Sequence, residues 1–140
     1  MESVWQSSCE LPQFPQLKQD LHVDVLIIGG GMAGLLTAYF LQQRGIDYVL
    51  VEKDRICNGV TGNTTAKITS QHGLIYSKLI NDFGRENARK YLEANENALR
   101  EYERLCESIE CDFEKRSAYT YSLNDRQKII DELEAVKSLG

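Results

Sequence analysis

Three glycines with fixed spacing are the residues of this sequence best suited to bind a charged ligand. Gly29, Gly31 and Gly34 form a Gly-x-Gly-x-x-Gly pattern within VLIIGGGMAG. Glycine loses more conformational freedom on ordering than any other residue, so three in one turn need a physical reason. In this pattern the first glycine permits a tight turn, the second lets the backbone approach a pyrophosphate, and the third lets a helix pack on a strand. The pattern therefore predicts a dinucleotide-binding turn.

The main chain after the second glycine is expected to contact the phosphates. A helix is predicted to begin near Met32 and to continue through Ala33. Its free N–H groups and the positive end of its dipole would face the phosphate oxygens. Glycine-rich turns are common, so the motif is informative only where a strand precedes it and a helix follows.

A carboxylate follows at the distance that a ribose-binding acid requires. Glu52 lies eighteen residues beyond Gly34, close to the expected spacing, and ends a predicted strand. It could accept hydrogen bonds from two vicinal ribose hydroxyls and would repel a 2′-phosphate, which disfavours NADP. The ordinary alternative is a solvated strand end. Lys53 is expected to act through its backbone near an adenine, and Arg55 either screens phosphates or pairs with a neighbouring acid such as Asp54.

The elements that must position these residues can be read from apolar patterns. Residues 22–28 form a continuous β-branched and apolar run, typical of a strand covered on both faces. Helical spacing follows through residues 35–41, and Gly45 stands where a helix C-terminal cap belongs. Residues 48–51 predict a second strand. Together they predict a right-handed, Rossmann-like βαβ unit of the α/β class.

The remaining chain divides into segments of different character. An arm over residues 1–21, with Trp5 and Phe14 as possible anchors, precedes the unit predicted for residues 22–76. That unit ends in a polar loop over residues 53–73, too long to be a plain connection. Residues 77–140 are predicted to form a helical segment and the start of a substrate region.

Within this last region we expect a long helix over 86–110, a strand within 113–123 and a helix over 125–139. The stripe expected on the long helix consists of Tyr91, Asn95, Ala98, Tyr102, Leu105 and Ile109. The inward residues expected on the last helix are Ile129, Ile130, Leu133 and Val136. Two strands cannot make a stable open sheet alone, so we expect a piece of a longer architecture or a shortened gene.

Composition and charge exclude several classes of function. The net charge is −5 and no block of Lys and Arg stands out, which argues against a nucleic acid or an anionic membrane as partner. No apolar run exceeds four residues, as at residues 25–28, which is too short to span a bilayer, and the first residues do not resemble a secretory leader. A cytoplasmic protein is expected. The four cysteines and two histidines are scattered, so we expect no metal site and reduced thiols.

The sequence from Val23 to Lys53 resembles the FAD-binding N-terminus of the D-amino-acid oxidase-like flavoproteins. The next stretch, NGVTGNTTAK at residues 58–67, is similar to the segment of that family that lies over the FAD pyrophosphate and reaches the flavin. Through Tyr76 the chain is most similar to a bacterial subset with a C-terminal Rieske two-iron domain. The resemblance implies FAD as cofactor. The further cofactor-binding residues that it implies are Gly59, Thr61, Gly62, Thr64, Thr65 and Lys67.

Departures from the family pattern limit what the resemblance implies. Lys67 stands where the family often has glycine, and its charge either faces the flavin or is solvated. Relatives with histidyl-linked FAD carry the histidine near Thr64, whereas His72 comes later and is expected to cap a loop. The chain lacks the second glycine-rich motif that closes the FAD site and the Rieske ligands. Weak or no stable FAD binding by these 140 residues is therefore expected.

The function expected from the resemblance is that of an FAD-dependent oxidoreductase, with hydride removed from a C–H beside an amine in a small amine or amino acid. No residue is identified as a catalytic acid or base. Tyr76, Tyr119 and Tyr121 either line a substrate site or pack in a core. One alternative is an NAD-dependent dehydrogenase, although the Thr- and Gly-rich segment favours flavin. The other is a truncated, non-catalytic remnant or interaction module.

Overall fold

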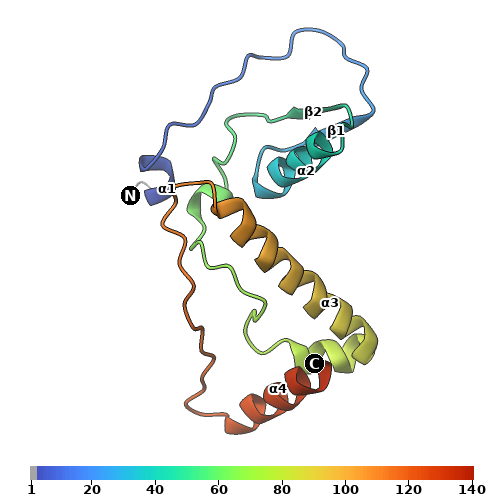
Figure 1. Ribbon diagram of the computed structural model, residues 1–140, viewed down its shortest axis with the longest axis vertical. Coiled ribbons are helices and arrows are strands. Elements are labelled where there is room, and N and C mark those ends of the chain that lie inside the picture. Colours follow the sequence, from blue (N-terminus) through green and yellow to red (C-terminus); the bar gives the residue numbers. More distant parts are fainter. Residues whose placement is uncertain (1–2) are drawn as a thin grey trace. The chain divides into compact units, whose positions relative to one another are not determined.

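Two separate units make up the computed structural model, which describes residues 3–140 (Figure 1). The first unit extends to Ala66, and the second runs from Lys67 to Gly140. In the first unit a short helix α1 (Val4–Ser7) is followed by β1 (Val25–Ile28), α2 (Met32–Gln43), β2 (Tyr48–Val51) and a 3₁₀ turn η1 (Thr61–Asn63). In the second unit the helices are α3 (Tyr76–Cys106) and α4 (Arg126–Leu139).

The first unit contains the predicted strand–helix–strand arrangement. β1 and β2 pair in parallel, with Val25 opposite Tyr48 and Ile28 opposite Val51. The first strand begins three residues later than predicted, because only residues 25–28 have partners in the second strand. It is also covered differently from the expectation. Ile27 is buried, but Ile28 is 82% exposed, so the prediction of a strand covered on both faces is wrong for the described residues.

Helix α2 begins and ends where the sequence indicates. Gly31 is its N-cap and supplies no side-chain hydrogen bond. At the other end Gly45 has φ 65°, its N–H donates to Gln42 O, and the N–H of Ile46 donates to Leu41 O. This pair of bonds is the Schellman arrangement, in which a left-handed residue closes a helix and satisfies its last carbonyls. The predicted cap at Gly45 is confirmed.

In the second unit a small core joins the start of α3 to α4. The core is centred on Tyr76, Ala88, Ala135 and Leu139. Gly84 adopts φ 79° inside α3 and interrupts the helical backbone there. Only glycine tolerates this conformation at little cost, and it produces a sharp kink. The part of α3 after the kink begins close to the predicted start at residue 86, while α3 as a whole begins ten residues earlier and ends four residues earlier than predicted.

Two further expectations for the second unit are corrected. Residues 113–123 form no strand, and Tyr119 and Tyr121 are exposed. Aromatic and β-branched residues favour a strand only when a partner strand and a covering layer are present, and the described residues provide neither. In α4, Leu133 is 51% exposed, and the preceding residue Glu132 is buried instead. The other inward positions, Ile129, Ile130 and Val136, are half-buried. No helix within residues 3–140 is both long and apolar enough to cross a bilayer.

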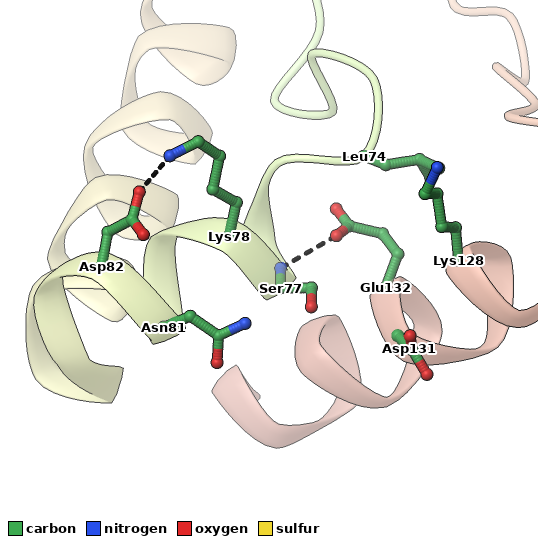
Figure 2. A pocket seen from close by; sticks show the side chains of 8 residues that line it. All are labelled: Leu74, Ser77, Lys78, Asn81, Asp82, Lys128, Asp131 and Glu132. Atoms are coloured by element: carbon green, nitrogen blue, oxygen red, sulfur yellow. Dashed lines mark hydrogen bonds and ion pairs between the residues drawn. The ribbon is translucent and has the colours of Figure 1, made fainter.

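Glu132 is buried because its carboxylate caps a different helix. The N-cap of α3 is Ile75, which has no side-chain acceptor. Glu132 Oε1 accepts from Tyr76 N at 2.9 Å and from Gln71 Nε2 at 2.7 Å, and Oε2 accepts from Ser77 N at 2.9 Å. Figure 2 shows this side chain reaching from α4 to the first turn of α3. A carboxylate there satisfies free N–H groups and complements the positive end of the helix.

Replacing Glu132 should therefore destabilise the second unit much more than replacing an exposed acid of the same helix. In Glu132→Ala the N–H groups of Tyr76 and Ser77 lose their acceptor, and we expect the free energy of unfolding to fall by about 2 kcal/mol. Glu134→Ala, a matched control at an exposed site, should change it by less than about 0.5 kcal/mol. Urea unfolding followed by helical circular dichroism measures both, and equal effects would contradict this role for Glu132.

Candidate functional site

The turn after β1 is built around a contact between its first and last glycines. Gly29 adopts φ 110°, and its N–H donates to Val51 O at 2.8 Å, which continues the sheet by one bond. A Cβ atom at Gly34 would overlap the carbonyl oxygen of Gly29. The first turn of α2 therefore packs directly on the main chain of the strand end, as the spacing of the motif predicts.

The middle of the turn leaves little or no room for side chains, and Gly30 is buried there. A Cβ at Gly30 would lie 2.7 Å from Ile56 Cγ2, and one at Gly31 would lie 3.2 Å from Thr61 Oγ1. The carbonyl of Gly30 accepts from Cys57 N at 2.9 Å. Sequence reasoning assigned no role to Gly30. The signal that could have found it is the run of three consecutive glycines, of which the motif explains only two.

Glu52 lies directly beside this turn. Its Oε2 atom accepts from Gly30 N at 2.7 Å, and its Oε1 atom accepts from Asp54 N at 3.2 Å. The Gly30 N–H, and secondarily the Asp54 N–H, hold the pKa of the Glu52 carboxyl below its usual range. The carboxylate is therefore ionised at neutral pH and fixed in orientation. Each oxygen still has a lone pair available for another donor.

A hollow opens at the carboxyl ends of the two strands. It has a volume of about 440 Å³ and is lined by Ile28, Gly29, Val51, Glu52 and Lys53. In open parallel sheets ligands bind outside the carboxyl ends of the strands, which is where this hollow lies. The structure thus brings the predicted acid, the first glycine of the motif and Lys53 to one surface.

Thr61 connects the second predicted segment to the first. Its Oγ1 atom accepts from Met32 N at 2.9 Å, so the hydroxyl lies over the first turn of α2. Because the oxygen accepts this bond, the hydroxyl proton is directed to another acceptor. Gly62, the next residue, is buried, and a Cβ there would overlap the carbonyl of Cys57.

Within residues 3–140, the other predicted cofactor-binding residues of the first unit make no hydrogen bond or ion pair with Glu52. Gly59, Thr65 and Arg55 are exposed, and the carboxylate of Asp54 accepts from Asn58 Nδ2 at 2.7 Å. The carbonyl of Thr64 accepts from Trp5 Nε1 at 2.7 Å, which makes Trp5 an anchor of the arm as expected. Phe14, the other expected anchor, is 70% exposed, so that expectation is wrong. Ala33 lies in the first turn of α2.

Several residues considered in the sequence belong to the second unit. Lys67 is exposed there. His72 Nε2 lies 3.4 Å from Asn95 Oδ1 on α3. Tyr76 is 1% exposed and its hydroxyl donates to Ser70 O at 2.6 Å; burial, with a smaller effect from Tyr91, raises the pKa of Tyr76 to about 12. Core packing is thus the role of Tyr76.

Within residues 3–140 no three side chains of His, Cys, Asp or Glu converge as a metal site.

Comparison with known proteins identifies similar chains. The sequence model of a family described as FAD dependent oxidoreductase matches residues 24–140. A Bacillus subtilis protein named as a Rieske 2Fe-2S iron–sulfur protein, YhfW, is 44% identical over 99% of this chain and 28% of its own length. An oxidoreductase named OrdL from Haemophilus influenzae is 30% identical over 82% of this chain. Gamma-glutamylputrescine oxidoreductase from Escherichia coli is 26% identical over 81%.

The chain spans little more than a quarter of the length of these relatives, 28% of the first and 27% of the other two. No solved structure matches it. The match to the family extends over both units, since it runs from the residue before β1 to the end of α4.

The packing of the turn predicts unequal effects for two glycine substitutions. Gly34→Ala places a methyl group against the Gly29 carbonyl, so we expect a loss of about 3 kcal/mol or more in the stability of the first unit. Gly59→Ala meets no atom within 4 Å and should change stability by less than about 0.5 kcal/mol. Chemical denaturation of the two variants and the parent chain tests this, and equal stabilities would refute the close packing.

The lowered pKa of Glu52 predicts a dependence of stability on pH. A carboxyl whose pKa is depressed by folding stabilises the fold fully above its unfolded value, near 4.5, and loses this as the pH falls through the folded value. The urea midpoint of the parent chain should therefore exceed that of Glu52→Gln at pH 7, and the difference should shrink as the pH falls below 4.5. A difference independent of pH would show that the Gly30 and Asp54 bonds do not act on the ionised carboxylate.

Proposed function

This chain belongs to the family of FAD-dependent oxidoreductases, and we propose that its first unit binds the adenosine diphosphate half of FAD across the turn from Gly29 to Gly34. The observation that carries this proposal is the 2.7 Å hydrogen bond between Gly30 N and Glu52, which holds the acid beside the turn. A turn for the pyrophosphate and an acid for the ribose are the two parts that a dinucleotide needs, and here they lie in contact.

The pyrophosphate would bind at the start of α2. The first N–H groups of a helix have no intrahelical acceptors, and they carry the positive end of its dipole. Gly31 leaves this end uncovered by any side chain of its own. The Thr61 hydroxyl, which accepts from Met32 N, is placed to donate its proton to a phosphate oxygen. These features fit a pyrophosphate without requiring a cationic side chain.

The ribose and adenine would bind on the side of β2. Glu52 already receives one bond at each oxygen, and its remaining lone pairs are available to the two ribose hydroxyls. The Gly30 N–H acts as a positioning group because it fixes the direction of the carboxylate. A ribose that carries a 2′-phosphate would place a second anion against the ionised Glu52, so FAD is favoured over NADP. The hollow beside Lys53 would accept the adenine.

For the longer protein we propose oxidation of a carbon–hydrogen bond beside an amine. FAD, when bound, supplies the acceptor for the hydride that leaves the substrate. One relative is named for gamma-glutamylputrescine, which supports an amine or amino-acid substrate. Residues 3–140 contribute binding and orientation of the cofactor to this reaction, and we assign none of them a catalytic role.

A Rieske cluster, named in the Bacillus relative, does not fit the residues of this chain. Such a cluster needs cysteine and histidine ligands together. His22 and His72 belong to different units, and no converging set of ligands exists within residues 3–140. We therefore derive no electron-transfer step through this chain.

The proposal predicts how the 140-residue chain discriminates between nucleotides. We expect it to bind ADP, and FAD only weakly at the same site, and to bind adenosine 2′,5′-bisphosphate at least about tenfold more weakly than AMP, which carries the same 5′-phosphate without the 2′-phosphate. Glu52→Gln should weaken ADP binding about tenfold and reduce the discrimination against the 2′-phosphate. Calorimetric titration measures the affinities. Glu10→Gln, an exposed acid of the arm, is the matched control and should behave as the parent chain.

Other outcomes would favour different functions. Binding of NAD in place of FAD would favour a dehydrogenase. A folded chain that binds no adenine nucleotide would refute the proposed site and favour a non-catalytic interaction module.

A further inference from the structure

The short helix α1 is joined to the segment that follows β2 by a long-range hydrogen bond. Trp5 Nε1 donates to Thr64 O at 2.7 Å, although the two residues are 59 positions apart in the sequence. Trp5 is the only tryptophan of the chain. Its bond is directed at a main-chain carbonyl, so it constrains the backbone of the loop.

The neighbouring residue of α1 makes a second contact with the same segment. A Cβ at Gly62 would lie 2.9 Å from Gln6 Nε2, so the absence of a side chain at residue 62 lets the arm approach. Gln6 is half-buried in this position, and Gly62 is buried. We call Trp5 and Gln6 the clip. The clip meets η1 and the residue after it, and both of its contacts are with backbone positions.

The turn that the clip contacts has little stability of its own. η1 consists of three residues and has no side-chain cap. Its local bonds run from Asn63 N to Val60 O and from Asn63 Nδ2 to Gly59 O, both 3.0 Å. Isolated 3₁₀ turns have poor hydrogen-bond geometry, and a loop with few buried contacts opens readily. Contacts from a distant segment therefore have a large effect on whether this turn stays formed.

The same turn carries Thr61, whose hydroxyl lies against Met32 N at the start of α2. We propose that the clip holds η1 so that Thr61 stays at the N-terminus of α2, which makes Trp5 and Gln6 positioning residues for the FAD pyrophosphate although neither touches it. The inference rests on the proposed function. Removal of the clip should increase the fraction of chains in which the turn is open and Thr61 is displaced. Cofactor affinity should fall by the factor by which the fraction with a closed turn falls.

The first test examines the loop without any cofactor. Trypsin cuts after Arg and Lys, and the exposed Arg55 and Lys67 flank the loop. Trp5→Phe keeps an aromatic ring but removes the N–H donor, so we expect cleavage at these two sites about fivefold faster than in the parent chain. Phe14→Leu, in the same arm and 70% exposed, should be cleaved at the parent rate. Equal rates for Trp5→Phe and the parent chain would overturn the proposal.

The second test measures FAD and ADP affinity in the same proteins. Trp5→Phe should raise both dissociation constants about fivefold, and the discrimination against the 2′-phosphate should be unchanged because Glu52 is not part of the clip. General unfolding would instead disturb the Glu52 side of the site as well. Gln6→Ala is a second variant that retains Trp5, and we expect it to bind FAD more weakly than the parent chain.

The outcomes separate the two proposals. Failure of the parent chain to bind FAD or ADP would refute the proposed function, and the clip inference with it. Normal binding by the parent chain and equally tight binding by Trp5→Phe and Gln6→Ala would leave the proposed function intact and overturn the clip inference alone. Faster cleavage of Trp5→Phe with unchanged FAD affinity would likewise overturn it, since the clip would then support the loop without affecting the site.

Discussion

The hydrogen bond from Gly30 N to Glu52 connects the turn after β1 to the residue that follows β2. β1 and β2 run in parallel and in register, so their carboxyl ends reach the same edge of the sheet. The bond of 2.7 Å then fixes the acid against the turn. It needs the compact backbone of Gly30, because a side chain there would strike Ile56. The site is therefore set by main-chain packing, and the polar groups occupy the positions that this packing leaves.

In both units, free N–H groups at the start of a helix donate to a side chain that belongs to another element. Gly31 and Ile75, the residues at the N-caps of α2 and α3, provide no side-chain acceptor. In the second unit Glu132 supplies the acceptor from α4, and in the first unit Thr61 supplies it from η1. A carboxylate at a buried helix end gives a permanent structural contact. A single hydroxyl leaves most of the helix dipole uncompensated, which is compatible with the proposed binding of the pyrophosphate.

The sequence was informative where a local constraint acts on few residues. The spacing of Gly29, Gly31 and Gly34, the acid at Glu52 and the cap at Gly45 each follow from a conformation or a contact that only those residue types allow. The turns of α3 before Gly84 were not predicted, because Gly84 interrupts the helical pattern while the chain continues through a kink. The strand expected within 113–123 depended on a partner that no local pattern reveals. In α4 Glu132 is buried where Leu133 was expected, because the N–H groups of Tyr76 and Ser77 donate to the Glu132 carboxylate. These donors are far away in the sequence, so no local pattern indicates them.

The uncovered side of the two-stranded sheet has a consequence for the behaviour of the chain in solution. Ile28 and its neighbour on the same side, Leu26, present apolar surface at the end of a strand whose outer edge has no partner among the described residues. Surface of this kind promotes edge-to-edge association between copies as the concentration rises. The highest concentration at which the isolated chain stays monodisperse is then limited by association between copies, and the free energy of unfolding does not determine it.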